Sequence, residues 1–201
     1  MALHRIFAIG RQFGSGGHEI GERLSERLGI PFYDKKLVTL AAEKLDISNV
    51  TAATLDEKTL DYFLSTYKME KESVSFDEST LPLSEQLYLA QSGIIKSLAD
   101  KGSCVIVGRC TDYILRDNPS CVSIFIYGNE AEKVKRIAEK YQLSEKKAKE
   151  KIKQVDMERR YYYESHTGKE WASHESHQML FNSSLLPIDD IVAVLEGYFV
   201  Y

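Results

Sequence analysis

The chain has 201 residues, of which 43% are hydrophobic and 28% charged, so one domain, residues 1–201, can bury a core of its own. Its net charge of −4 at neutral pH argues against a nucleic-acid binder, because such proteins need a cationic face that displaces counterions from the polyanion. The three cysteines lack paired spacing and no apolar run reaches membrane-spanning length, so we expect a cytoplasmic protein with no disulfide scaffold, no zinc site and no membrane contact.

The first predicted element is a strand over residues 6–9, which runs directly into a glycine-rich turn and then into a helix over 20–28. Backbone amides in such a turn, together with the positive end of the helix dipole, bind phosphate, and glycine lets the anion approach without a Cβ in the way. The phosphate-binding residues are therefore predicted to be Gly14, Ser15, Gly16, Gly17 and His18.

The turn departs from the P-loop consensus G-x-x-x-x-G-K-[ST], in which the lysine contacts the β- and γ-phosphates and the hydroxyl binds magnesium. Aligned on its Gly-Ser-Gly core, the chain has Arg11 at the first glycine position, Gly17 at the lysine position and His18 at the Ser/Thr position. Either another cation and another magnesium ligand replace these groups, or the turn binds phosphate without the full catalytic equipment.

Two other interpretations of the turn remain open. A dinucleotide-binding loop would need a third glycine where the chain has Glu19, although Asp34 lies about as far downstream as the acid that binds the ribose. A glycine turn with a purely structural role is the other alternative.

Strand and helix patterns alternate along the rest of the chain. An extended segment over 31–34 precedes a helix over 37–45. Residues 51–69 have helical spacing, and residues 70–80 are polar without periodicity, which predicts a mobile loop. The later elements are expected to be a helix over 83–98, a strand over 104–107, a short helix from 113, a strand over 121–127, helices at about 130–141 and 144–163, a strand over 179–181 and a helix after Pro187. This alternation predicts an α/β fold with a parallel sheet and ligands at the carboxyl ends of its strands.

Arg109 follows the predicted strand 104–107 almost directly, at the place where an open α/β sheet presents ligand-binding groups. A guanidinium at that edge can bind phosphate with two hydrogen bonds. The alternative is an arginine that caps a carbonyl or pairs with a surface acid.

Residues 130–165 mix lysine, arginine and acidic side chains, with only a thin apolar stripe. Helices of this kind are expected to pack weakly and to swing, as a lid does when it brings arginines to a polyphosphate. Most lysines of the segment are interpreted as a solvated helix face, whereas the adjacent Arg159 and Arg160 are interpreted as functional.

Two further clusters are interpreted as structural. His174 and His177 have helical spacing but no third ligand nearby, which favours a surface or strand-start role, so no metal site is predicted. The tyrosines at 161–163, followed by Trp171, could stack on a nucleobase, but packing near a helix end is the commoner role of such a cluster.

Taken together, these residues resemble the cytidylate-kinase-like family, a branch of the P-loop nucleoside monophosphate kinases. The resemblance implies a P-loop NTPase-like fold: a five-stranded parallel sheet with helices on both faces, an acceptor-binding insertion over 46–82 and a helical lid over 130–165. It rests on segments 11–21, 31–35 and 107–109, on Asp112 with Tyr113, on Asp156 with Arg159 and the tyrosines, on 167–169 with Trp171, and on Asn182 with Ser183.

The resemblance also implies roles for single residues. Asp34 and Arg109 resemble groups that face the acceptor, and Arg11 is the candidate replacement for the P-loop lysine. Authentic cytidylate kinases have the P-loop lysine, a hydroxyl residue beside it and an Asp after the Gly-Arg pair, where this chain has Gly17, His18 and Cys110, so cytosine specificity does not follow. The catalytic arginines are expected to be Arg11, Arg136, Arg159 and Arg160.

The predicted function is a phosphotransferase that moves the γ-phosphoryl group of ATP, with Mg²⁺, to a nucleoside monophosphate or a similar small phosphorylated acceptor. Such a reaction depends on positioning and on charge neutralisation. Two alternatives remain open: a nucleotide-binding regulator that transfers nothing, and a P-loop kinase for a non-nucleotide acceptor.

Overall fold

Five parallel strands form one sheet, in the spatial order β2-β3-β1-β4-β5, in the computed structural model, which describes residues 4–34, 36–46, 48 and 81–200. The central strand β1 is in register with β3 through Ile6 and Cys104, and with β4 through Ile6 and Cys121. The parallel five-stranded sheet expected from the sequence is confirmed. The strands are β1 (Ile6–Arg11), β2 (Phe32–Tyr33), β3 (Cys104–Val107), β4 (Cys121–Tyr127) and β5 (Met179–Asn182).

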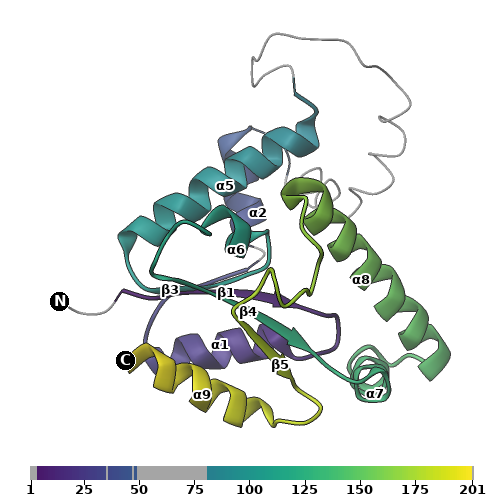
Figure 1. Ribbon diagram of the computed structural model, residues 1–201. Helices are drawn as coiled ribbons and strands as arrows, with labels where there is room; N and C mark the ends of the chain where they lie inside the picture. The colour runs from purple at the N-terminus through teal and green to yellow at the C-terminus, as the bar shows by residue number, and fades with distance from the viewer. Residues whose placement is uncertain (1–3, 35, 47, 49–80, 201) are drawn as a thin grey trace.

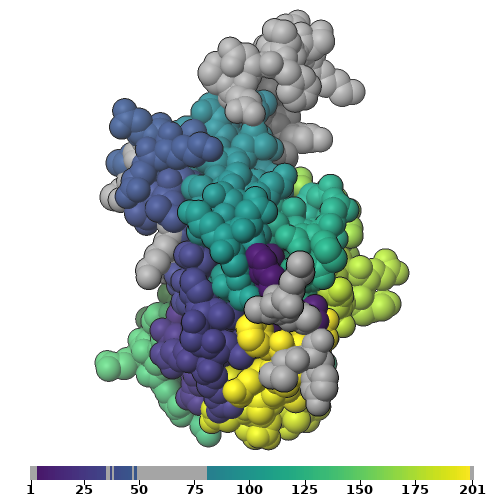
Figure 2. Space-filling view, turned by 90° about the vertical axis from the view of Figure 1, so that its left-hand side faces the viewer, coloured from purple at the N-terminus to yellow at the C-terminus, as the bar shows by residue number. Residues whose placement is uncertain are grey.

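Helices cover both faces of the sheet, also as expected (Figure 1). Helices α1 (Gly17–Leu28) and α9 (Ile188–Val200) lie side by side on one face, and α2 (Lys36–Lys44), α5 (Leu83–Lys101) and α6 (Thr111–Ile114) lie on the other. Figure 2 shows the two layers in purple with yellow and in blue with teal. The segment expected to act as a lid, residues 130–165, lies in the helices α7 (Glu130–Tyr141) and α8 (Glu145–Thr167), beyond the carboxyl end of β4.

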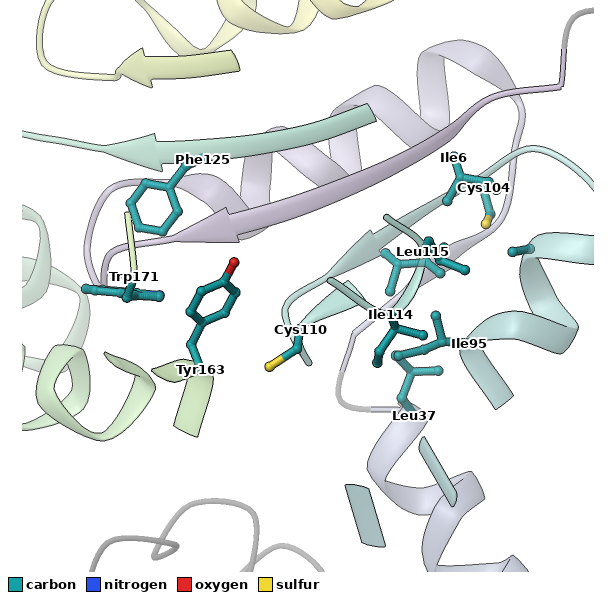
Figure 3. Close-up of a cluster of buried hydrophobic side chains, with 12 residues drawn as sticks. Ile6, Leu37, Ile95, Cys104, Cys110, Ile114, Leu115, Phe125, Tyr163 and Trp171 are labelled. Carbon is teal, nitrogen blue, oxygen red and sulfur yellow. The ribbon is translucent and has the colours of Figure 1, made fainter. Parts of the chain in front are cut away.

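Alternate side chains of the strands fill two separate cores. In β1, Ile6 packs into the cluster under α5 and α6, and Phe7 packs into the cluster under α1 and α9. Figure 3 shows the first cluster, in which Phe125 of β4 lies beside Trp171 and Tyr163. Both phenylalanines are fully buried, which contributes roughly 1.5–3 kcal/mol for each side chain. The sheet is therefore packed against helices on both faces, and the carboxyl ends of its strands remain available for a functional site.

Some predicted segments lie outside the described residues. The helical spacing over 51–69 and the loop over 70–80 belong to this group, and so does most of the acceptor-binding insertion expected over 46–82. Within the described part of the chain, no helix is long and apolar enough to cross a membrane.

Candidate functional site

The glycine-rich turn connects β1 to α1 and is fixed in shape by its own side chain. Gly14 and Gly16 have φ of 84° and 80°, left-handed conformations that glycine adopts without strain. The hydroxyl of Ser15, which is buried between them, donates to the carbonyl oxygens of Gln12 at 2.9 Å and Ile126 at 3.0 Å. Helix α1 begins directly after the turn, where the first amides of a helix have no partner inside it.

A cleft of about 1300 Å³ opens at this turn. Its walls come from the turn, the start of α1, the loop after β3, and helices α7 and α8. The predicted site residues that line it are Arg11, Gly14, Gly16, Gly17, His18, Asp34, Arg109, Arg136 and Arg159. The structure thus brings together most of the residues that the sequence singled out, from both ends of the chain.

Ser15 and Arg160 are the two predicted residues that do not belong to the lining. The side chain of Ser15 points back to β4, as described above, so any phosphate contact from this residue would come from its backbone. Arg160 is exposed, and its guanidinium lies over the Trp171 ring at 5.9 Å. Its neighbour Arg159 lies in the cleft, so α8 directs the two adjacent arginines to different surroundings.

A buried ion pair ties α7 and α8 to the glycine-rich turn. The amide of Phe13 donates to Asp156 Oδ1 at 2.6 Å, and Lys133 Nζ lies 3.4 Å from Asp156 Oδ2. The same Lys133 Nζ donates to Gln12 Oε1 at 2.9 Å. Lys133 is buried, so the interpretation of this segment's lysines as a solvated face is wrong for this residue.

Apolar contacts reinforce this attachment. Ile137 of α7 and Ala148 and Ile152 of α8 are buried together, with Phe13 of the turn packed against them. The apolar stripe is thin, as expected, but it docks on the turn in this structure. Whether the two helices swing open stays a prediction.

The arginines in the cleft are close enough to affect each other. Arg159 Nη1 donates to the carbonyl oxygen of Arg11 at 3.2 Å, and its guanidinium lies 5.6 Å from the centre of the Phe13 ring. Burial lowers the pKa of Arg159 below its ordinary value, Asp156 opposes that effect and the charge of Arg109 adds to it. Because arginine remains protonated in proteins, this part of the cleft holds concentrated positive charge.

Arg109 stands on a strained turn directly after β3. Both Arg109 and Cys110 have positive φ, 60° and 52°, which is uncommon outside glycine. The guanidinium of Arg109 lies 5.9 Å from the centre of the Tyr162 ring. This turn places Arg109 at the carboxyl edge of the sheet, where the sequence predicted it.

Arg136 is held at the start of α1 by one acidic side chain, Glu19. Its Nη2 forms an ion pair with Glu19 Oε2, and the other oxygen of Glu19 lies 2.6 Å from Arg23 Nη2. A Cβ on Gly16 would lie 3.0 Å from Ile188 Cδ1 and 3.4 Å from Arg136 Nη1. Arg136 therefore lies beside the turn, but Glu19 already neutralises part of its charge.

His18, at the Ser/Thr position of the turn, contacts a carboxylate from the neighbouring strand. Its Nε2 lies 2.8 Å from Asp34 Oδ2, and Asp34 follows β2 at the edge of the cleft. In the described residues, no group of three or more side chains could hold a metal ion by itself. Mg²⁺ usually takes one or two carboxylates and completes its shell with phosphates and water, and a single carboxylate such as Asp34 fits that pattern.

A buried polar cluster at the far wall was missed by the sequence analysis. Tyr163 Oη donates to Asp112 Oδ2 at 2.7 Å, and His177 Nε2 lies 3.8 Å from the same oxygen. The side chain of His177 is 1% exposed and packs against Phe125 and Tyr163. The surface role expected for it is therefore wrong, whereas the alternative of a strand-start role fits its place two residues before β5. The cluster joins segments that are far apart in the sequence, and the sequence marked Asp112, the tyrosines and His177 separately without indicating their contact.

Burial lowers the pKa of His177 below its ordinary value, although Asp112 and the Ser173 carbonyl oppose the shift. Below about pH 6.5 the unfolded chain therefore binds a proton at this histidine that the folded chain does not bind. As the pH falls, the unfolding free energy decreases by up to about 1.4 kcal/mol for each pH unit. Denaturant titrations of the unchanged protein and of His177→Gln should give free energies that converge as the pH falls. The exposed His174→Gln is the matched control, and a constant difference at all pH values would contradict the expectation.

Comparisons with known proteins agree with this geometry. A search of curated proteins finds no match. Among solved structures, an uncharacterized protein from Eubacterium ventriosum is 28% identical, with a TM-score of 0.71 over 97% of this chain and 98% of that one. A shikimate kinase from Bacteroides thetaiotaomicron is 12% identical, with a TM-score of 0.55 over 98% of this chain and 99% of that chain.

A gluconokinase from Sinorhizobium meliloti is also 12% identical, with a TM-score of 0.52 over 100% of this chain and 94% of its own. At such identities the two kinases show a shared fold and leave the acceptor open. The family model described as cytidylate kinase-like matches residues 6–185, and the chain therefore belongs to the cytidylate kinase-like family.

Proposed function

We propose that this chain is a phosphotransferase that moves the γ-phosphoryl group of ATP to a nucleoside monophosphate or a similar small phosphorylated acceptor. The observation that carries the proposal is one cleft lined by the glycine-rich turn and by Arg11, Arg109 and Arg159, which come from β1, the loop after β3 and α8. Phosphoryl transfer needs little covalent chemistry from the protein, and such a cleft supplies the positioning and the positive charge that it does need.

The turn and the start of α1 would hold the phosphates of ATP. Backbone amides at residues 14–18 and the positive end of α1 attract the anion, and Ser15 fixes the shape of the turn without occupying it. Mg²⁺ would neutralise the β- and γ-phosphates, and Asp34, which His18 contacts and which the family resemblance places toward the acceptor, is a carboxylate that would help to hold it where the acceptor and the phosphates meet.

The acceptor would lie on the side of Arg109. The positive charge of Arg109 lowers the pKa of Arg159, so the two guanidinium groups repel each other inside the cleft. An anion bound between them would stabilise both. A phosphorylated acceptor supplies that anion and, being already ionised, needs no base to remove a proton. An acceptor with only a hydroxyl would need a base, and carboxylates such as Asp34 line the cleft, so it is the charge of the two arginines that favours the phosphorylated class.

A regulator that binds nucleotide without transfer is the second candidate. The specific observation in its favour is that Gly17 and His18 replace the lysine and the hydroxyl that assist transfer in a consensus P-loop. Such a protein would still close around ATP through the contacts described above.

A panel of nucleoside monophosphates with ATP or GTP and Mg²⁺, assayed for product, separates the candidates. Turnover with a nucleoside monophosphate is the expected result. Binding of ATP without turnover on any acceptor would support the regulator, and turnover only with hydroxy acids or other non-nucleotide compounds would replace the proposed acceptor. A reaction without Mg²⁺ should show no product, because the charge on the transferring group would stay unscreened.

A further inference from the structure

The side chain of Arg11 occupies the space where a residue-17 side chain would begin. An ideal Cβ placed on Gly17 would lie 2.6 Å from Arg11 Cβ and 3.2 Å from Arg11 Cγ. Real Cβ atoms do not approach each other this closely, so side chains at positions 11 and 17 exclude one another unless one of them moves. The contact matters because these are the first glycine and the lysine positions of a P-loop.

The guanidinium of Arg11 rests on a second glycine, Gly108, at the end of β3. A Cβ on Gly108 would overlap Arg11 Nη1 and would lie 3.2 Å from Arg11 Cζ. Arg11 thus starts at the end of β1, passes over the first residue of α1 and ends against Gly108, and it lines the cleft. Glycine at 17 and at 108 leaves this path open.

We propose that Arg11 and Gly17 have exchanged the roles that a P-loop gives to its first and seventh positions. Arg11 contacts the β- and γ-phosphates from the end of β1, and Gly17 and Gly108 are positioning residues that keep its path free. This inference rests on the proposed function only in taking a polyphosphate as the ligand. Arginine suits the new position, because its planar fork can bind two phosphate oxygens and its length compensates for the different starting point.

The backbone of Arg11 is also held, which makes the position of its side chain definite. Its carbonyl oxygen accepts a hydrogen bond from Arg159 Nη1 at 3.2 Å, and Gln12 N donates to Ile126 O at 2.9 Å directly after it. Arg11 is therefore fixed to β4 and to α8 at the same time. A phosphate bound at the turn would contact an arginine whose backbone is fixed in position.

Three variants test the exchange: Arg11→Gly, Gly17→Lys and the double variant that carries both. The probes are ATP with Mg²⁺ and inorganic tripolyphosphate, measured by calorimetry, with thermal unfolding as the check on folding. Arg11→Gly should weaken binding about 10- to 100-fold, as expected for a lost charge-assisted contact. Gly17→Lys should also weaken it, because the new side chain displaces Arg11.

The double variant should bind more tightly than either single variant, because it restores the consensus order of glycine and lysine. Recovery will be incomplete, since a Cβ at position 17 also lies 3.3 Å from Ile126 Cβ. If Arg11→Gly binds the probes as the unchanged protein does, or if the double variant binds no better than Arg11→Gly, the exchange is wrong.

Gly108→Ala tests the resting place of the guanidinium separately. It should weaken binding about tenfold in the unchanged background and have no further effect when Arg11 is already glycine. Gly29→Ala is the matched control, because Gly29 also has a positive φ, 63°, but a Cβ there meets nothing within 4 Å. An equal loss in both backgrounds would show that Gly108 acts through the backbone and not through Arg11.

The binding measurements keep this inference apart from the proposed function. If the protein binds ATP in an Arg11-dependent way but transfers no phosphoryl group, the exchange of roles is supported and the proposed transferase function is wrong. If the Arg11→Gly variant transfers phosphate with full activity, the transferase function is supported and the exchange of roles is wrong.

Discussion

Replacing Arg159 with alanine is expected to lower kcat/KM for phosphoryl transfer by about 10³-fold, the lower end of the range for an arginine that stabilises the transferring group. Arg159 lies in the cleft, contacts the backbone of Arg11 and packs over the ring of Phe13. Its charge is thus delivered by α8 to the glycine-rich turn. Steady-state kinetics with ATP, Mg²⁺ and the acceptor found in the panel measures the effect.

Neighbouring positions on α8 supply the comparisons for Arg159. Arg159→Lys keeps the charge but loses the planar fork, so it should fall between the alanine variant and the unchanged protein. Lys153→Ala removes an exposed charge outside the cleft lining and should leave the rate unchanged. Arg160→Ala should cost less than Arg159→Ala, because Arg160 lies over Trp171. Equal losses for Arg159→Ala and Lys153→Ala would mean that only the general charge of α8 matters.

The parts of the site that the sequence could predict are those set by local pattern. The strand, turn and helix around Gly14 and Gly16 are contiguous, so their order alone predicts a phosphate-binding turn. Arg109 could be placed because parallel strands end at one edge of the sheet, and β3 was recognisable as a continuous apolar run. In each case the residues that form the sequence pattern are within a few positions of the residues whose structure the pattern predicts.

The parts that could not be predicted depend on contacts between distant segments. Arg159 and Arg160 are adjacent, and only the docking of α8 decides which of them enters the cleft. Lys133 looks like any other lysine of a charged helix until Asp156 and Gln12 are brought to it. The sequence marked Arg11 and Gly17 as unusual, but their mutual exclusion is visible only in three dimensions.

The pH dependence of stability offers a test of the Asp156 environment. Burial raises the pKa of Asp156, while the Phe13 amide and Lys133 oppose the shift. An acid whose pKa is higher in the folded chain binds its proton more tightly there, so its contribution to the unfolding free energy falls as the pH rises from about 3.9, the unfolded value, through the folded one. The Asp156→Asn variant should lack this decline. If the variant and the unchanged protein show the same dependence of unfolding free energy on pH, the carboxyl is in contact with solvent.

Asp156→Ala is expected to lower the free energy of unfolding by about 3 kcal/mol, the lower end of the cost of removing one partner of a buried ion pair. The side chains of Lys133 and Asp156 are only 10% and 16% exposed, so the loss leaves a buried ammonium without its carboxylate and the Phe13 amide without its acceptor. Denaturant unfolding measures the change, and ATP affinity should fall with it because the turn loses its attachment to α8.

Two variants separate these losses. Asp156→Asn keeps an oxygen for the Phe13 amide and places a neutral group where burial already favours the protonated acid, so it should lower the unfolding free energy less than alanine does. Adding Lys133→Met to Asp156→Ala removes the unpaired ammonium and should recover part of the lost stability. Asp117→Ala is the control, because Asp117 is 89% exposed beside Arg116 and its loss should leave the unfolding free energy unchanged. If Asp156→Ala proves as stable as that control, the turn is not held by α8 in solution. The arginines of this helix would then need another route to the phosphates, because Asp156 holds the amide of Phe13, two residues after the Arg11 carbonyl that Arg159 contacts.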